Sequence, residues 1–184
     1  MDNAEVIEKL KKGNDLYLEA RQSAGDVSPA IRRRTAEEGQ HPYAIVIACS
    51  DSREIPEAIF SAGIGELFVI RVAGNVLDNH QLGSIEYAAS HLDANVIVVL
   101  GHTRCGAVSA TIKGAKEGYI RYITDDIRSA IGGETDDYRA TVLNVKHGVS
   151  VIRQAFREHP EIPSGELDII GAVYNVESGK VDWL

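Results

Sequence analysis

The chain has 184 residues, of which 44% are hydrophobic and 25% charged, as is typical of one folded globular domain and unlike a disordered chain. Its formal net charge of −8 at pH 7 argues against a nucleic-acid or membrane-surface binder, because no basic face dominates. No stretch reaches the roughly 18 consecutive apolar residues of a membrane-spanning helix, and the amino terminus lacks the apolar core of a signal peptide. We therefore expect a cytoplasmic protein with no nucleic-acid or membrane partner, in which Cys49 and Cys105 are thiols or thiolates.

Two helical segments, residues 2–22 and 28–39, precede the first predicted strand. Neither has an obvious sheet partner within one subunit. We therefore expect this amino-terminal helical arm, residues 1–39, to pack on a neighbouring subunit.

Apolar runs alternate with helical stretches over the rest of the chain. This alternation predicts an α/β fold, a single domain over residues 1–184 with a mostly parallel central β-sheet flanked by helices. Continuous apolar runs predict three strands covered on both faces, at 43–49, 67–73 and 95–101. Helices are predicted over 55–63, 80–92, 107–118 and 138–158. Within 167–184 we expect a last strand, a turn at Ser178-Gly179 and a short return strand. Segment 119–137 fits no element clearly.

Two polar motifs stand where predicted strands end. The motif CSDSR (49–53) follows the first strand, and GHTRCG (101–106) follows the third. Open parallel sheets place their sites at the carboxyl ends of strands, and adjacent strands lie about 5 Å apart. Two thiolates and one imidazole suit zinc, and three protein ligands leave a fourth position open, as in catalytic sites. The sequence therefore predicts a Zn²⁺ site formed by Cys49, His102 and Cys105.

An ion pair between Asp51 and Arg53 is predicted beside this metal. An arginine partner keeps an aspartate ionised and can hold it in a bidentate pair. Asp51 could then orient a zinc-bound hydroxide, or, if the pair broke, swing onto the metal as a fourth ligand and close the site. The simpler interpretations are a buried cysteine that only packs and a structural salt bridge, but the two motifs together favour the metal.

The charge of the ligands bears on pH dependence. Two thiolates and a neutral imidazole offset the charge of Zn²⁺, so bound water should be less acidic than at an all-histidine site, where it titrates near ~7. We therefore expect the best activity in mildly alkaline conditions.

Five stretches resemble the β-class carbonic anhydrases, namely residues 39–53, 66–77, 84–92, 96–108 and 173–184. The paired C-x-D-x-R and H-x-x-C-G signatures, in this order and spacing, are highly specific to that superfamily. The resemblance implies an enzyme that hydrates carbon dioxide reversibly to bicarbonate and a proton, by attack of zinc-bound hydroxide. It also implies the three zinc ligands named above and the Asp51–Arg53 dyad.

The resemblance further implies residues around the substrate and a quaternary structure. Gln40 matches a residue that helps hold substrate, and the Gly106 N–H matches a donor to a substrate oxygen. Phe68 and Tyr87 match positions that line the cleft, some of them contributed by the neighbouring subunit. The family implies a homodimer, often paired into a tetramer, with the amino-terminal helices wrapped over the partner.

One departure from the family pattern bears on the state of the site. Some members carry a tryptophan three residues before the first cysteine ligand, as part of a bicarbonate site that favours the closed state; here Val46 stands there. We therefore expect the open arrangement, with Asp51 paired to Arg53.

Two other functions stay open from the sequence. A carbon disulfide or carbonyl sulfide hydrolase on the same scaffold would have the same metal ligands. A zinc-binding oligomer without activity is the second alternative, and the presence of Asp51, Arg53 and Gln40 argues against it.

Overall fold

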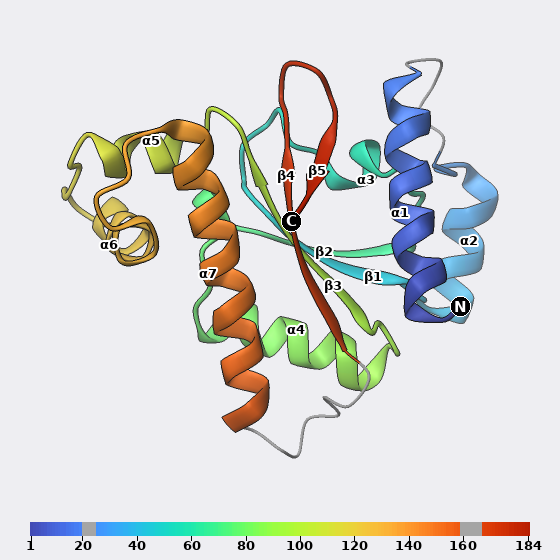
Figure 1. The fold of residues 1–184 in the computed structure, drawn as a ribbon. Coiled ribbons are helices and arrows are strands. Elements are labelled where there is room, and N and C mark those ends of the chain that lie inside the picture. The colour runs from blue at the N-terminus through green and yellow to red at the C-terminus, as the bar shows by residue number, and fades with distance from the viewer. Residues whose placement is uncertain (20–24, 159–166) are drawn as a thin grey trace.

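A five-stranded sheet, in the order β2-β1-β3-β4-β5, lies at the centre of the structure (Figure 1). The structure is a computed structural model, and it describes residues 1–19, 25–158 and 167–184. Strands β1 to β4 run parallel, and only the short β5 is antiparallel to its neighbour. The predicted single α/β domain with a mostly parallel sheet is thus confirmed.

In chain order the elements are α1 (Asn3–Leu18), α2 (Pro29–Glu38), β1 (Ala44–Ala48), α3 (Pro56–Ile59), β2 (Leu67–Arg71), the 3-10 turn η1 (Ala73–Asn75), α4 (Asn79–His91), β3 (Val96–His102), α5 (Gly106–Ile112), α6 (Ile120–Ile131), α7 (Asp137–Glu158), β4 (Asp168–Tyr174) and β5 (Val181–Trp183).

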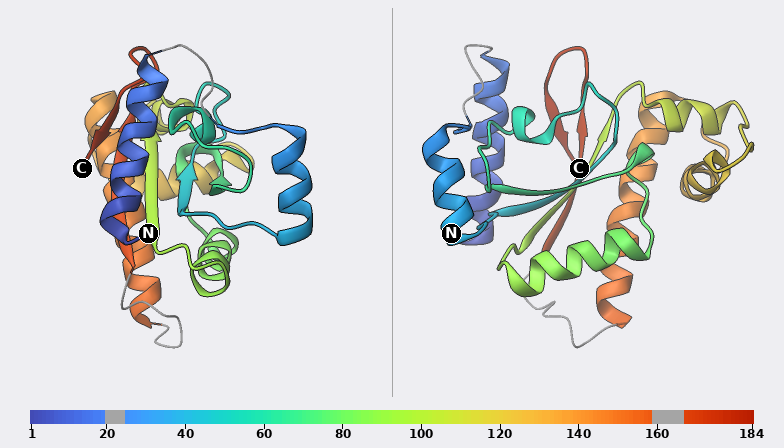
Figure 2. Two further views of the ribbon diagram at one scale, coloured as in Figure 1. Left: turned by 90° about the vertical axis from the view of Figure 1, so that its right-hand side faces the viewer. Right: turned by 180° about the vertical axis from the view of Figure 1, so that it is seen from behind.

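Helices cover both faces of the sheet (Figures 1 and 2). Successive side chains of a strand point to opposite faces, so β1 supplies residues to two separate cores. Ile45 and Ile47 pack in the core under α4 and α7, whereas Val46 packs in the core under α1 and α3. Every residue of β1 and β3 is buried, as their continuous apolar runs predicted.

The prediction of burial on both faces is wrong for β2. Its residues Leu67–Ile70 are only partly buried and Arg71 is exposed, because β2 forms one edge of the sheet. The strand also ends at Arg71 instead of residue 73. The chain turns there into η1, where Gly74 and Asn75 have positive φ angles of 69° and 46°.

Several predicted helix boundaries differ for backbone reasons. The helix predicted over 107–118 ends at Ile112, because the chain turns at Gly114, which has a φ of 81°. The helix predicted over 55–63 is the short α3, which gives way to Ser61 with a φ of 50°. Helix α6 occupies most of the segment 119–137, for which no element was predicted.

The two amino-terminal helices differ in their packing. Val6 and Leu10 of α1 are buried in the core beside β1 and β3, so the expectation that α1 lacks a sheet partner in its own subunit is wrong. Helix α2 buries only Ile31 and stands at the edge of the molecule (Figure 2). Packing of this arm on a second subunit stays a prediction. Residues 20–22, the end of the first predicted helix, lie outside the described residues.

Gly13 lets α1 approach α3 closely. A Cβ at this position would overlap the backbone carbonyl of Phe60, which cannot move without shifting the chain. We expect Gly13→Ala to lower the free energy of unfolding by about 1–3 kcal/mol, as overpacking does. Gly83→Ala is the matched control on α4, because a Cβ there meets nothing within 4 Å. In urea unfolding, Gly83→Ala should be as stable as the wild type or up to about 1 kcal/mol more stable. Equal losses of stability in both variants would contradict the packing argument.

Candidate metal centre

Three side chains meet where β1 and β3 end side by side. Cys49 follows β1, His102 is the last residue of β3, and Cys105 is the N-cap of α5. Their ligand atoms lie within 4.8 Å of one another. Across residues 1–19, 25–158 and 167–184, no other group of three histidine, cysteine, aspartate or glutamate side chains is close enough to hold a metal ion.

The histidine is oriented to act as a ligand. His102 is fully buried, and its Nδ1 lies 3.0 Å from the carbonyl oxygen of Thr103. A carbonyl can only accept, so Nδ1 carries the proton and Nε2 presents its lone pair. Nε2 has no hydrogen-bond partner among the described residues, although it is buried. A buried acceptor left in this state, facing two sulfurs, fits a metal ligand.

The two cysteine thiols shift each other's pKa values. Both are buried, with exposures of 4% for Cys49 and 1% for Cys105. A hydrogen bond from the Cys105 thiol lowers the pKa of Cys49, and the Gly74 N–H, 3.1 Å from the sulfur, adds to this effect. The same contact, together with burial, raises the pKa of Cys105. The two sulfurs thus lie close enough together to bind one Zn²⁺, which takes cysteine as the thiolate.

A carboxylate stands next to the three ligands. Arg53 donates to Asp51 twice from its side chain, from Nε at 2.9 Å and from Nη2 at 2.7 Å, and its backbone N–H donates at 2.9 Å. These bonds hold the pKa of Asp51 well below its usual range. One Asp51 oxygen lies 3.9 Å from His102 Nε2. The structure therefore pairs the carboxylate with arginine beside the three side chains, as the open arrangement requires, and the open state of a metal-loaded site stays a prediction.

Two further residues at this site were not predicted from the sequence. Glu54 is fully buried, accepts the Cys49 N–H at 2.8 Å, and has its pKa raised to about 8 by burial. Arg71 reaches from β2 to the backbone of the loop 49–54. A charge at the end of an apolar strand was a signal for Arg71, whereas no spacing singled out Glu54.

The four residues expected around the substrate fall into two groups. Gly106, the first residue of α5, follows Cys105 and lies at the ligand cluster. Gln40, by contrast, precedes β1, whereas Cys49 follows it, so the five-residue strand separates them. Phe68 and Tyr87 lie together on β2 and α4, with ring centroids 6.3 Å apart. Tyr87 is 49% exposed. The structure does not bring these last three residues to the metal ligands of their own chain.

A buried Cys-His-Cys set beside an arginine-bound aspartate, at the carboxyl ends of parallel strands, is compatible with the zinc centre of an α/β enzyme. Comparison with known proteins narrows this class. The family profile described as carbonic anhydrase matches residues 44–181. The chain belongs to the carbonic anhydrase family, and its structural relatives place it in the β-class.

Relatives match over most of their length. The chain is 35% identical to a carbonic anhydrase of Mycolicibacterium smegmatis, covering 94% of this chain and 89% of the relative. It is also 35% identical to carbonic anhydrase 2 of Mycobacterium tuberculosis, covering 93% and 87%. The β-carbonic anhydrase CafA of Aspergillus fumigatus superposes with a TM-score of 0.72 at 28% identity, covering 85% and 81%. One of two tetrameric β-carbonic anhydrases of Sordaria macrospora superposes with a TM-score of 0.69 at 25% sequence identity, covering 85% of this chain and 87% of the relative.

Membrane insertion by a helix finds no support in the described part of the chain. None of its helices combines the length and the apolar character needed to cross a bilayer.

Proposed function

We propose that this carbonic anhydrase converts carbon dioxide and water reversibly to bicarbonate and a proton at a zinc ion held by Cys49, His102 and Cys105. The observation that carries the proposal is the convergence of three buried ligand atoms within 4.8 Å, one of which, His102 Nε2, has no other partner among the described residues. We also propose a cytoplasmic location, where Cys49 and Cys105 stay reduced and can bind the metal.

The chain's own residues would orient the reaction. When bound, zinc supplies a Lewis acid that lowers the pKa of a water molecule enough for it to act as a nucleophile. Asp51, ionised and fixed by Arg53, accepts a hydrogen bond from this water and directs its oxygen toward the carbon of CO2. The Gly106 N–H donates to a substrate oxygen, on which negative charge develops. In this reaction the water oxygen would form the new C–O bond while one C=O electron pair moved onto the substrate oxygen near Gly106, and the proton of the water would leave to solvent or buffer.

A second copy of the chain completes the site in this proposal. Gln40, Phe68 and Tyr87 lie away from the ligands of their own chain, so they would reach substrate only across a subunit interface. The partly buried edge strand β2 and the exposed Tyr87 offer apolar surface for such an interface. A homodimer, alone or paired into a tetramer, is therefore the proposed unit, and the amino-terminal arm would pack on the partner. Tetrameric relatives from Sordaria macrospora support this.

Stopped-flow CO2 hydration on protein of known zinc content tests the proposal. We expect fast hydration that scales with zinc content. Absence of hydration at full zinc loading would contradict the proposal. Turnover of carbon disulfide or carbonyl sulfide by the same sample would then identify a hydrolase, and no turnover of any of these substrates would identify a zinc-binding oligomer without this activity.

The pH profile is a separate prediction. Cys49 and Cys105 bring two negative charges, so the nucleophilic water should lose its proton at a higher pH than at an all-histidine site, where it does so near ~7. Because the deprotonated form reacts, kcat should rise into the mildly alkaline range. Asp51 does not cause this rise, since its pKa is held far below it.

Glu54 requires a control in this experiment, because burial raises its pKa to about 8. The profile of Glu54→Gln separates the two groups, and the rise in kcat should persist in it. A flat wild-type profile, or a rise that disappears in Glu54→Gln, would refute the assignment to water.

A further inference from the structure

Arg71 holds the loop that carries both Cys49 and Asp51. It is the last residue of β2, directly opposite Ala48 in the parallel register, so its side chain extends over the loop that follows β1. Its Nε donates to the carbonyl oxygen of Cys49 at 2.9 Å. Its Nη2 donates to the carbonyl oxygens of Asp51 at 2.8 Å and Glu54 at 2.7 Å. One guanidinium therefore binds the beginning, middle and end of the loop.

Glu54 holds the same loop from the inside. Its buried carboxyl group accepts the Cys49 N–H at 2.8 Å, and its own N–H donates to the Asp51 carbonyl oxygen at 3.0 Å. No carboxylate among the described residues forms an ion pair with Arg71. All of the hydrogen bonds found for Arg71 go to backbone carbonyls, which is the pattern of a brace for the chain and not of a surface ion pair.

This brace bears on the metal and on the aspartate together. Arg71 fixes the backbone carbonyl group of Cys49, which is bonded to the Cα that carries the sulfur side chain. It fixes the carbonyl group of Asp51 in the same way, next to the Cα that carries the carboxylate paired with Arg53. A displacement of about 1 Å at such groups can cost a factor of about 100 in rate. Groups that orient metal ligands typically change metal affinity by about 10- to 100-fold when removed.

We propose that Arg71 is a positioning residue, which fixes the loop 49–54 so that Cys49 faces the metal and Asp51 stays paired with Arg53. Its effect on catalysis rests on the proposed function, whereas its effect on metal retention rests only on zinc binding by Cys49, His102 and Cys105. The hydrogen bonds that Arg71 makes go to backbone carbonyl oxygens and not to the Cys49 sulfur or the Asp51 carboxylate.

Arg71→Lys tests the proposal, because lysine keeps the charge but places all its donors on a single atom, which cannot span three carbonyls. On the zinc-loaded protein we expect transfer of zinc to a colorimetric chelator to be about 10- to 100-fold faster than in the wild type. The absorption bands of the cobalt-substituted protein should shift, since Cys49 changes orientation. In CO2 hydration we expect kcat to fall with KM unchanged.

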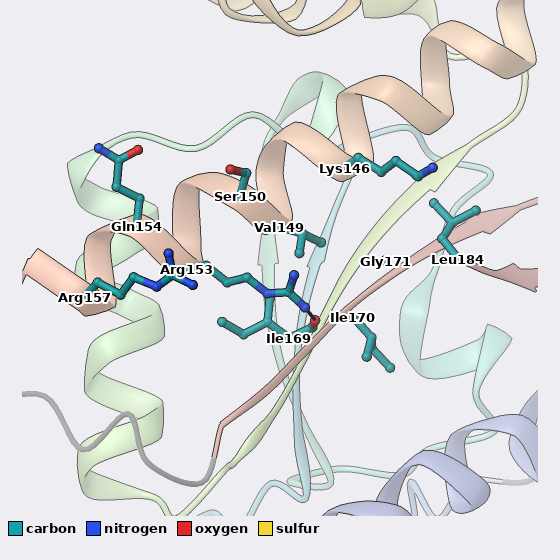
Figure 3. A pocket seen from close by; sticks show the side chains of 10 residues that line it. All are labelled: Lys146, Val149, Ser150, Arg153, Gln154, Arg157, Ile169, Ile170, Gly171 and Leu184. Atoms are coloured by element: carbon teal, nitrogen blue, oxygen red, sulfur yellow. Dashed lines mark hydrogen bonds between the residues drawn. The ribbon is translucent and has the colours of Figure 1, made fainter.

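Arg153→Lys is the matched control. Arg153 lies on α7 beside a cavity of about 620 Å³ and also donates to a backbone carbonyl, that of Ile169 on β4, at 2.9 Å (Figure 3). This bond is at the opposite end of the sheet from the metal ligands, since Ile169 is the second residue of β4, which runs parallel to β3, and His102 is the last residue of β3. Arg153→Lys should therefore change stability alone. Equal zinc release from both variants, or wild-type zinc release and cobalt spectrum in Arg71→Lys, would overturn the proposal.

Chemical rescue covers the case in which Arg71→Lys is too unstable to load with zinc. Arg71 is exposed, so added methylguanidinium can reach the position left by Arg71→Ala. Slower zinc release in methylguanidinium, but not in methylammonium, would support the proposal, because guanidinium ions otherwise destabilise proteins. No difference between the two ions would refute it. If the wild type hydrates no CO2, the zinc-release and cobalt experiments still decide on Arg71.

Discussion

Replacing Cys49 with serine should leave the protein without bound zinc and without CO2 hydration. A serine hydroxyl does not ionise near neutral pH, so the variant would offer zinc one thiolate and one imidazole in place of the full set. The loss in zinc affinity should exceed the about 10- to 100-fold change that follows loss of a supporting hydrogen bond. Metal analysis after dialysis, followed by stopped-flow hydration on the same sample, measures both effects.

Ser50→Ala is the control for this experiment. Ser50 is the next residue in the chain and is exposed, so its variant passes through the same expression and dialysis without the loss of a ligand. It should retain zinc and activity. Full zinc occupancy in Cys49→Ser would show that the ligand set has been assigned wrongly.

Asp51→Asn should retain zinc but lose about 10²- to 10³-fold in kcat, the loss expected when one preorganised hydrogen-bonding group is removed. Arg53 presents two N–H donors to two carboxylate oxygens, at 2.9 and 2.7 Å. An asparagine offers one oxygen and one NH2 group, so one of these donors would face another donor. The side chain also loses its negative charge and one of the two carboxylate oxygens that could accept a hydrogen bond from the attacking water.

The matched control is Asp125→Asn. Asp125 pairs with Arg128 at 2.6 Å on the surface of α6, so it repeats the same chemical change where no reaction takes place. Because surface pairs contribute about 0–1 kcal/mol, this variant should keep wild-type kcat and nearly wild-type stability. Wild-type kcat in zinc-loaded Asp51→Asn would exclude the role given to the carboxylate.

Sequence periodicity predicted the fold best where burial is complete. The runs that became β1 and β3 are buried throughout, and their apolar character alone marked them. The errors lie where other forces decide. An equally apolar run became the edge strand β2, because strand order is set by packing between distant segments. Helix α5 ends at Ile112, shortly before the turn at Gly114, whose positive φ is a property of the folded chain.

For the site, the sequence predicted which side chains meet but not which residues hold them in place. Side chains that follow parallel strands must meet at one edge of the sheet, so the positions of Cys49 and His102 followed from the strand assignment. The contribution of Arg71 could not be predicted in this way. It depends on where three backbone carbonyls point, and carbonyl direction is not encoded in residue type. The location of Gln40 at the opposite end of β1 likewise became visible only in three dimensions.

The proposed ligands Cys49 and His102 lie at the ends of two neighbouring strands, β1 and β3, and this has a mechanical consequence. Cys49 and His102 are far apart in the sequence, and a metal bound to both closes a long loop of chain, as a covalent cross-link would. Such a link removes entropy from the unfolded chain, and an ion that binds only the native state adds its own binding free energy to folding. The metal would thus act as a staple between neighbouring strands, so that chelation loosens the sheet as well as stopping the reaction.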